Sequence, residues 1–518
     1  MALVPPEKHP HLELAQTTQG PKAPVYLHIA IVSPELLSVI APTKLGSTTQ
    51  SLAQALHGAG QDVRIFMPWS YGVNTAPLGS LLERGEVQVP DGAGTQTFKV
   101  LEGRLNGMTV HLLDNEPFFA SHHPYGDAEG PYAENWRRYS LFAKAVLASL
   151  DLLPFRPDVI HCMDWATGVL PLYQKLFYIG KLPKHPAARA GCFFGVNNLA
   201  IQGVFERDVL PQMDIPFELF RQVEGVEHGG KLNFMKVGIE FATAVGTHSP
   251  GHALKIQEMD RGYGLEAVFK RRADQLFGIH NGIDYSAWNP SIDASLPANF
   301  DSGSQGMAGK KKCKASLQSS LKLDNGPRTP LACCIGRWDA DSGFDLVIEC
   351  LTELLERGVE VVIMGQGNEE ISNRLHSAEK AFPGRLRVID GFNAHTTHQM
   401  MAGSDFMLLP YHYQPSNSFF AIAMRYGALP VIFENGGLEL AVVDQRQNES
   451  QGTGFHFEPY TAAGLRECLL EVIQCYRDAE TWDALVQRAM AVDYSWSATA
   501  TSYLKAYRKV VQMAKKER

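Results

Sequence analysis

The segment "PYHYQPSNSFFAIAMRYG", Pro410 to Gly427, follows an apolar run and has the pattern of a strand end, a tight loop and a helix start. In α/β proteins ligands bind at such turns, so charged side chains are expected there. This loop instead offers amide and hydroxyl groups at Gln414, Ser416, Asn417 and Ser418, with no carboxylate, lysine or cysteine. These groups can hydrogen-bond a ligand, but they carry no charge with which to stabilise a reaction.

Two features of the same half of the chain suit a sugar or a nucleotide. Aromatic faces pack well on sugar rings, and aromatic side chains gather near the loop at Tyr411, His412, Tyr413, Phe419 and Phe420. We assign the two phenylalanines to the core at a helix start. The turn "NGGL" can place backbone N–H groups against a ligand, or it is an ordinary glycine turn after a strand; it comprises Asn435, Gly436, Gly437 and Leu438.

The strands and helices that must position these groups follow one alternating pattern, and this pattern occurs twice along the chain. Short apolar runs such as "VYLHIAIVS" and "DVIHCMDW" alternate with helical segments such as "TTQSLAQALHGAG". The pattern restarts after a loop-rich region at 284–328, with "PLACCIG", "VEVVIMG" and "FMLLPY". Alternating strands and helices predict a mainly parallel sheet that is covered on both faces. Two such domains predict a cleft between the carboxyl ends of their strands.

The same pattern gives the domain boundaries. We expect a disordered lead-in at 1–23, an N-terminal domain at 24–279 and a C-terminal domain at 280–496. The amphipathic segment 497–518 predicts a helix that packs back on the N-terminal domain.

Composition narrows the partners and the compartment. The chain has 518 residues, 45% of them hydrophobic and 20% charged, as in soluble globular proteins of more than one domain. A formal charge of −8 argues against nucleic acid and anionic membranes as partners. Eight scattered cysteines indicate buried, reduced thiols. Because we find no targeting or membrane-spanning segment, we expect the cytoplasm, or the plastid stroma for a mature plant or algal form.

Five blocks, in this order, resemble the glycogen synthases and the bacterial or plant starch synthases: "DVIHCMDWATGVLPLY", "NNLAIQGVF", "KLNFMKVGIEFATAVGTHSPGHALKIQ", "YGLEAVFKRRADQLFGIHNGIDYSAWNP" and "AMRYGALPVIFENGGL". Those proteins are retaining glycosyltransferases that use ADP-glucose. The resemblance implies the GT-B fold, an α/β fold in which two doubly wound, Rossmann-like domains face each other across a cleft. It further implies an N-terminal acceptor side, a C-terminal nucleotide-sugar side, ADP-glucose as possible ligand or substrate, and no metal or other cofactor.

Glucosyl transfer from a nucleotide sugar needs cations for the departing diphosphate, close backbone approach at a glycine turn, and groups that stabilise charge at the anomeric carbon. The family supplies these groups with a Lys-x-Gly-Gly turn, a histidine, an arginine and a lysine, and a glutamate loop. In this sequence four of those catalytic or donor positions hold Ala41, Asn197, Ser342 and Gln414.

The resemblance leaves other residues as binding candidates. For the nucleotide sugar they are Lys44, which stands beside Thr43 at the family's two glycines and could replace the lost lysine, Arg337, which is retained, and the turn from Asn435 to Leu438. The candidates for glucan binding are Glu134, Asp164, Asn197, Asn198, Tyr411 and Tyr413.

Two main hypotheses follow. Removing one charge-stabilising group costs on the order of 10²–10³ in rate, so several losses predict a non-catalytic or strongly impaired member, a pseudoenzyme. Such a protein would bind an α-glucan, and in glucan initiation also an active synthase or initiation factor. The alternative is an active α-1,4-glucan synthase that transfers glucose from ADP-glucose to the non-reducing end of a glucan with retention. A third hypothesis is a GT-B enzyme with a changed donor or acceptor.

Overall fold

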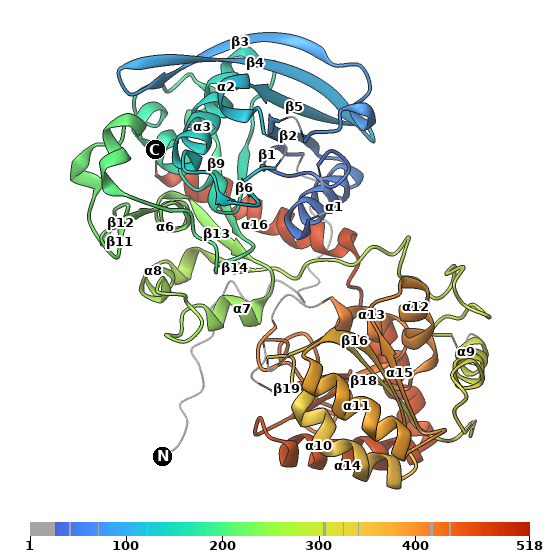
Figure 1. Ribbon diagram of the computed structural model, residues 1–518. Helices are drawn as coiled ribbons and strands as arrows, with labels where there is room; N and C mark the ends of the chain where they lie inside the picture. Colours follow the sequence, from blue (N-terminus) through green and yellow to red (C-terminus); the bar gives the residue numbers. More distant parts are fainter. Residues whose placement is uncertain are drawn as a thin grey trace. The chain divides into compact units, whose positions relative to one another are not determined.

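The computed structural model describes residues 26–40, 43–70, 72–121, 123–303, 307–324, 326–339, 341–414, 418–434 and 437–517. The chain forms two compact units, drawn in Figure 1. Unit 1 consists of Met1–His280 and Trp496–Arg518, and unit 2 of Asn281–Ser495. The predicted lead-in at 1–23 lies outside the described residues, as do Ala41, Ser416, Asn417, Asn435 and Gly436.

Within the described residues, unit 1 is built on a nine-stranded sheet. Its order is β14 (Leu276–Gly278), β13 (Ala244–Thr247), β9 (Gly191–Val196), β8 (Val159–Met163), β1 (His28–Val32), β2 (Asp62–Trp69), β5 (Met108–Asp114), β4 (Gly94–Leu105) and β3 (Leu82–Asp91). The strands from β14 to β5 are parallel, and β4 and β3 continue the sheet antiparallel. The buried runs of β8 and β9 are typical of parallel strands covered on both faces.

Helices cover both faces of this sheet. On one face α1 (Lys44–Gly58) and α16 (Trp496–Lys516) share a hydrophobic core with alternate residues of β1 and β2. On the other face lie α3 (Asn135–Leu152), α4 (Leu170–Tyr173) and α6 (Phe234–Phe241). Tyr507 of α16 contacts the buried His161 of β8, with 2.7 Å between the hydroxyl and Nδ1. The helix at the end of the chain is therefore part of unit 1.

Shorter elements complete unit 1. The helices are α2 (Glu116–Phe119), α5 (Pro186–Arg189), α7 (Pro250–Lys255) and α8 (Glu266–Arg271). The strands are β6 (Gly126–Asp127), β7 (Gly130–Pro131), β10 (Val204–Phe205), β11 (Glu227–His228) and β12 (Lys231–Asn233).

Unit 2 has a parallel six-stranded sheet in its described residues. Its order is β17 (Leu386–Asp390), β16 (Glu360–Gly367), β15 (Leu331–Trp338), β18 (Phe406–Leu409), β19 (Leu429–Phe433) and β20 (Phe455–Phe457). The helices are α9 (Met307–Ser320), α10 (Phe344–Glu356), α11 (Glu369–Ala381), α12 (Ala394–Gly403), α13 (Phe419–Arg425), α14 (Ala462–Arg477) and α15 (Ala479–Ala491). If the six strands are numbered along the chain, their order in the sheet is 3-2-1-4-5-6, which is the order of the Rossmann fold.

The two sheets confirm the predicted α/β class with two doubly wound domains. In such sheets ligands bind outside the carboxyl ends of the strands, where the order reverses. In unit 2 this switch point lies between β15 and β18, and in unit 1 between β1 and β8. These two places are where candidate site residues should be sought.

Candidate functional site

The switch point of unit 2 brings two predicted motifs together. The turn after β15 and the loop after β18 are joined by a backbone hydrogen bond, in which the His412 amide donates to the Asp341 carbonyl at 3.1 Å. Gly343 in this turn has a φ of +70°, and a Cβ there would lie 2.1 Å from the Pro410 carbonyl oxygen. The turn therefore needs glycine, both for its backbone conformation and for its close approach to the loop.

Arg337 and Ser342 differ sharply in their surroundings. The Arg337 side chain is 81% exposed, and its Nε lies 4.0 Å from the Asp339 carboxylate. Ser342 is buried, and its hydroxyl donates to Asp339 Oδ1 at 2.6 Å. The position predicted to lack a cation thus holds a neutral hydroxyl that is bound to an acid. Arg337 can supply positive charge to a ligand, against the opposing field of Asp339.

The loop after β18 places its residues at different depths. Gln414 and Tyr413 are half-buried. Tyr411 belongs to the hydrophobic core of unit 2, and its hydroxyl donates to the Ile335 carbonyl at 3.2 Å. The glucan contacts of Tyr411 and Tyr413 stay predictions, but the ring of Tyr411 packs as a core side chain.

The turn after β19 is described from Gly437 onward. Gly437 has a φ of +94°, and its amide donates to the Glu439 carboxylate at 2.7 Å. Leu438 is buried. The N–H group predicted to face a nucleotide is therefore bound to a carboxylate in this structure.

The switch point of unit 1 is built around Asp164, which follows β8. Its φ is +66°, and its side chain accepts hydrogen bonds from the amides of Trp165 at 2.9 Å and Asn198 at 3.1 Å. Burial raises the pKa of Asp164 to about 7. The neighbouring Asn197 donates from Nδ2 to the Gly195 carbonyl at 3.4 Å. Asp164, Asn197 and Asn198 thus meet at the carboxyl ends of β8 and β9.

Sequence reasoning missed a second buried carboxylate at this edge. Glu35 follows β1 and is 3% exposed. It accepts a hydrogen bond of 2.5 Å from the Tyr125 hydroxyl and another from the Thr43 hydroxyl. Burial raises the pKa of Tyr125, and the charges of Glu35 and Asp164 add to this effect. The signal that could have found Glu35 is its place directly after the first strand of the sheet.

Lys44 and Glu134 lie at helix starts. Thr43 has extended backbone (φ −124°) and caps α1, because its side chain accepts the Gly46 amide; Lys44 is the first residue of that helix. Loss of solvation lowers the pKa of Lys44. Glu134 precedes α3, and its exposed carboxylate lies 3.7 Å from Arg137 Nη1. Thr43 therefore works as a helix cap where the family's glycine was expected.

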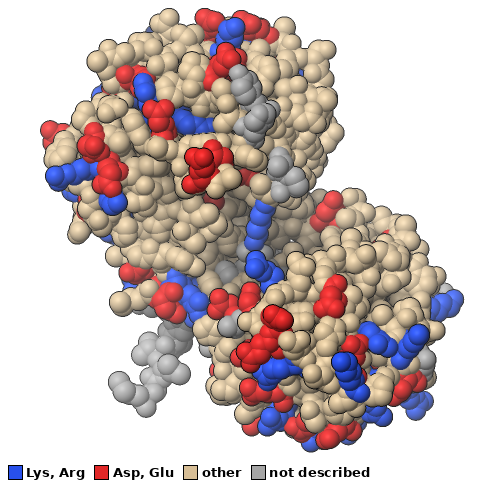
Figure 2. Space-filling model, viewed as in Figure 1, with Lys and Arg blue, Asp and Glu red and all other residues tan. Residues whose placement is uncertain are grey.

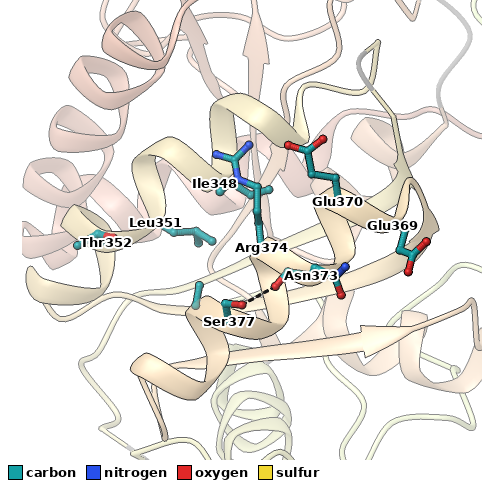
Figure 3. A pocket seen from close by; sticks show the side chains of 9 residues that line it. Ile348, Leu351, Thr352, Glu369, Glu370, Asn373, Arg374 and Ser377 are labelled. Atoms are coloured by element: carbon teal, nitrogen blue, oxygen red, sulfur yellow. Dashed lines mark hydrogen bonds between the residues drawn. The ribbon is translucent and has the colours of Figure 1, made fainter.

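A hollow of about 600 Å³ lies on unit 2 between α10 and α11 (Figure 3). Ile348 and Leu351 form its apolar part, and Asn373 and Arg374 its polar part. It contains none of the predicted site residues, and we assign it no ligand.

Two Rossmann-like units, each with polar groups at the switch point of its sheet, have the architecture of the GT-B class of glycosyltransferases. Residues 28–271 match the family model described as starch synthase catalytic domain, and residues 320–489 match glycosyl transferases group 1. The chain is 35% identical over 483 residues to glycogen synthase 2 of Geobacter sulfurreducens, with 93% of this chain and 98% of that protein covered. It is also 35% identical over 492 residues to the glycogen synthase of Anaeromyxobacter sp. (strain Fw109-5), with 93% and 99% covered. The chain therefore belongs to the glycogen and starch synthase family.

A solved structure agrees with this assignment. The catalytic domain of starch synthase IV from Arabidopsis thaliana, bound to ADP and acarbose, superposes with a TM-score of 0.75 at 27% identity, covering 94% of this chain and all of that one (100%). The predicted family and the GT-B fold are confirmed. The sequence relatives are named glycogen synthases, which supports the alternative of an active synthase more than the expectation of a non-catalytic module.

Proposed function

We propose that this protein is an α-1,4-glucan synthase that transfers glucose from a nucleotide sugar, ADP-glucose, to the non-reducing end of an α-glucan with retention. The observation that carries the proposal is Arg337, an exposed cation at the switch point of a sheet in Rossmann order. The names of the relatives and the ADP and acarbose in the starch synthase IV structure support this choice of donor and acceptor.

In the proposed reaction Arg337 neutralises charge that grows on the diphosphate as it departs, which stabilises the transition state more than the ground state. Gln414 hydrogen-bonds the donor sugar through its amide. Lys44 adds a second cation. The turn at 435–438 approaches the nucleotide with its backbone, which requires Gly437 to exchange its bond to Glu439 for one to the ligand.

The acceptor residues are proposed from the edge of unit 1. Asn197 and Asn198 offer amide groups to sugar hydroxyls, and Asp164 holds the turn that carries them. Glu134, Tyr411 and Tyr413 remain further candidates for glucan contact. An α-glucan is the proposed partner.

A second candidate function, glucan binding without turnover, is favoured by the bond between Ser342 and Asp339. This bond occupies the position of the family's second diphosphate-facing cation, and Gln414 carries no charge. In this case a synthase or an initiation factor is the additional partner.

We further propose that the protein works in the cytoplasm. All eight cysteines are described and unpaired, which suits a reducing compartment. No helix among the described residues is long and apolar enough to cross a membrane. On the face drawn in Figure 2 basic and acidic side chains are interspersed, so this face offers no broad basic surface for nucleic acid.

The test is direct incorporation. Purified protein is incubated with glycogen and labelled ADP-glucose, with UDP-glucose in parallel, and label in the polymer is counted. We expect incorporation from ADP-glucose that is lost in Arg337→Ala. No incorporation, combined with calorimetric binding of maltooligosaccharides, would replace the synthase by the binding module. If the protein shows no incorporation and also no binding of maltooligosaccharides, both proposed functions are contradicted.

A further inference from the structure

A second cavity in unit 2 lies near the amino ends of the strands, whereas Arg337 lies at the carboxyl end of β15. It has a volume of about 630 Å³ and is lined by α9, by the 327–328 segment and by the junction of α14 and α15. Asp405, at the amino end of β18, forms part of its wall and accepts the Leu331 amide at 2.8 Å. Because ligands of the sheet itself bind at the carboxyl ends, this cavity is separate from the candidate donor site.

Two lysines of α9 form the inner wall, and the ammonium group of each is hydrogen-bonded to other parts of unit 2. Lys310 donates to the carbonyls of Ala402 at 3.2 Å, Ser404 at 2.9 Å and Tyr426 at 2.8 Å. Burial lowers the pKa of Lys310 to about 8. These bonds fix α9 to the unit.

Lys314 is likewise hydrogen-bonded within the unit. It donates to Asp405 Oδ2 at 2.5 Å, to the Thr329 carbonyl at 2.6 Å and to the Tyr476 hydroxyl at 2.8 Å. The ion pair neutralises Asp405. Among the described residues of the lining, Asp483 is the only other acidic one.

The rim carries three cations of a different kind. Lys311, Arg328 and Arg477 line the same cavity from three separate segments and are exposed. Among the ion pairs of the described residues, none involves these three side chains. Arg477 ends α14, where a cation also interacts favourably with the helix dipole, but this does not account for the other two.

The remaining wall is apolar and aromatic. Trp482 and Tyr476 meet edge to face with ring centroids 5.0 Å apart, and Val486 and Pro327 lie on the same lining. The volume is within the range of small-molecule sites, roughly 300–1,000 Å³. Cations and an apolar wall that line the same cavity suit a ligand with an anionic end and an organic body.

We propose that this cavity binds a small phosphorylated metabolite, with its phosphate at Lys311, Arg328 and Arg477 and its organic part against Trp482. The site also touches the donor side through one chain of contacts. Lys310 binds the carbonyl of Tyr426, and Tyr426 follows α13, the helix that begins after the loop of Gln414.

The test uses calorimetry and thermal unfolding of the whole chain. The probes are a hexose monophosphate, adenosine monophosphate and inorganic phosphate. The triple variant Lys311→Ala/Arg328→Ala/Arg477→Ala removes the rim cations, and Lys312→Ala is the matched control, because Lys312 is exposed on the same helix but absent from the lining. Arg337→Ala separates this site from the donor site.

We expect at least one organic phosphate to bind and to raise the unfolding temperature. Its affinity should fall at least about tenfold in the triple variant, as for the loss of charge-assisted hydrogen bonds, and stay unchanged in Lys312→Ala and Arg337→Ala. The unliganded variants should unfold like the parent, because the substituted side chains are exposed. The proposal is overturned by no binding at millimolar concentration, by equal binding to the triple variant, or by equally tight binding of inorganic phosphate.

Discussion

The backbone amide of His412 donates a hydrogen bond of 3.1 Å to the carbonyl of Asp341. This bond ties the loop of Gln414 to the turn of Arg337 and Ser342, although the two motifs are about seventy residues apart in the sequence. A shift of either segment is therefore transmitted to the other. The predictions below begin with this contact.

Gly343→Ala should separate the two motifs. Its new Cβ would lie 2.1 Å from the Pro410 carbonyl oxygen, on a backbone with φ +70°. Gly358→Ala is the matched control, because it has φ +86° but its Cβ finds no atom closer than 3.8 Å. We expect a loss of about 1–2 kcal/mol in free energy of unfolding for the control and about 1–3 kcal/mol more for Gly343→Ala. Urea unfolding measures both, and equal losses would contradict the close approach.

The Glu35 network makes unit 1 sensitive to one hydroxyl. Tyr125→Phe removes a hydrogen bond from a buried carboxylate and, among the side chains that the structure describes, leaves the Thr43 hydroxyl as its donor. Loss of a partner for a buried polar group costs about 1–3 kcal/mol. Urea unfolding should show this loss, whereas Tyr263→Phe, at an exposed tyrosine, should stay within about 0.5 kcal/mol of the parent. An unchanged free energy of unfolding for Tyr125→Phe would show that the hydrogen bond from Tyr125 to Glu35 does not stabilise unit 1.

Asp164 gives a pH dependence with a definite sign. Its folded-state pKa of about 7 lies above the ordinary value of 3.8, so between these values the folded chain holds a proton that the unfolded chain releases. The free energy of unfolding should therefore fall as pH rises through this window, by at most about 1.4 kcal/mol per pH unit. Asp164→Asn removes the titration. Urea unfolding of both proteins at about pH 5 and about pH 7 should show the parent losing stability relative to the variant; parallel curves would contradict the shift.

Charge restoration tests the interpretation of the donor loop. Gln414→Glu alone should change the rate of glucosyl transfer less than about tenfold, because Ser342 still supplies no cation. Adding Ser342→Lys should raise the rate at least about tenfold over either single variant, since such groups act together. Ser342→Ala controls for loss of the hydroxyl without added charge. A gain of about 100-fold from Gln414→Glu alone would show that the other substitutions are misread.

The sequence predicted the fold well, because strand and helix periodicity are local properties. The runs that became β1, β8, β15 and β18 are visible as short apolar stretches, and their alternation with helices implies parallel sheets. One block of family resemblance, "DVIHCMDWATGVLPLY", contains β8, at whose carboxyl end unit 1 has its switch point.

Side-chain partners were harder to predict. Glu35 and Tyr125 are 90 residues apart, and no periodic pattern reports that they meet. Tyr411 and Tyr413 look alike in the sequence, yet Tyr411 turns into the core. The hydrogen bond between Ser342 and Asp339 depends on the path of a turn, which residue types alone do not determine.

The return of α16 to unit 1 has a consequence for biosynthesis. The chain leaves unit 1 at His280 and rejoins it only at Trp496. Tyr507 packs on Phe193 of β9, with ring centroids 5.5 Å apart, so this part of the core cannot close until α16 has left the ribosome. Unit 2, although it is translated later, has its whole sequence available earlier. Unit 1 is therefore begun before unit 2 and completed after it.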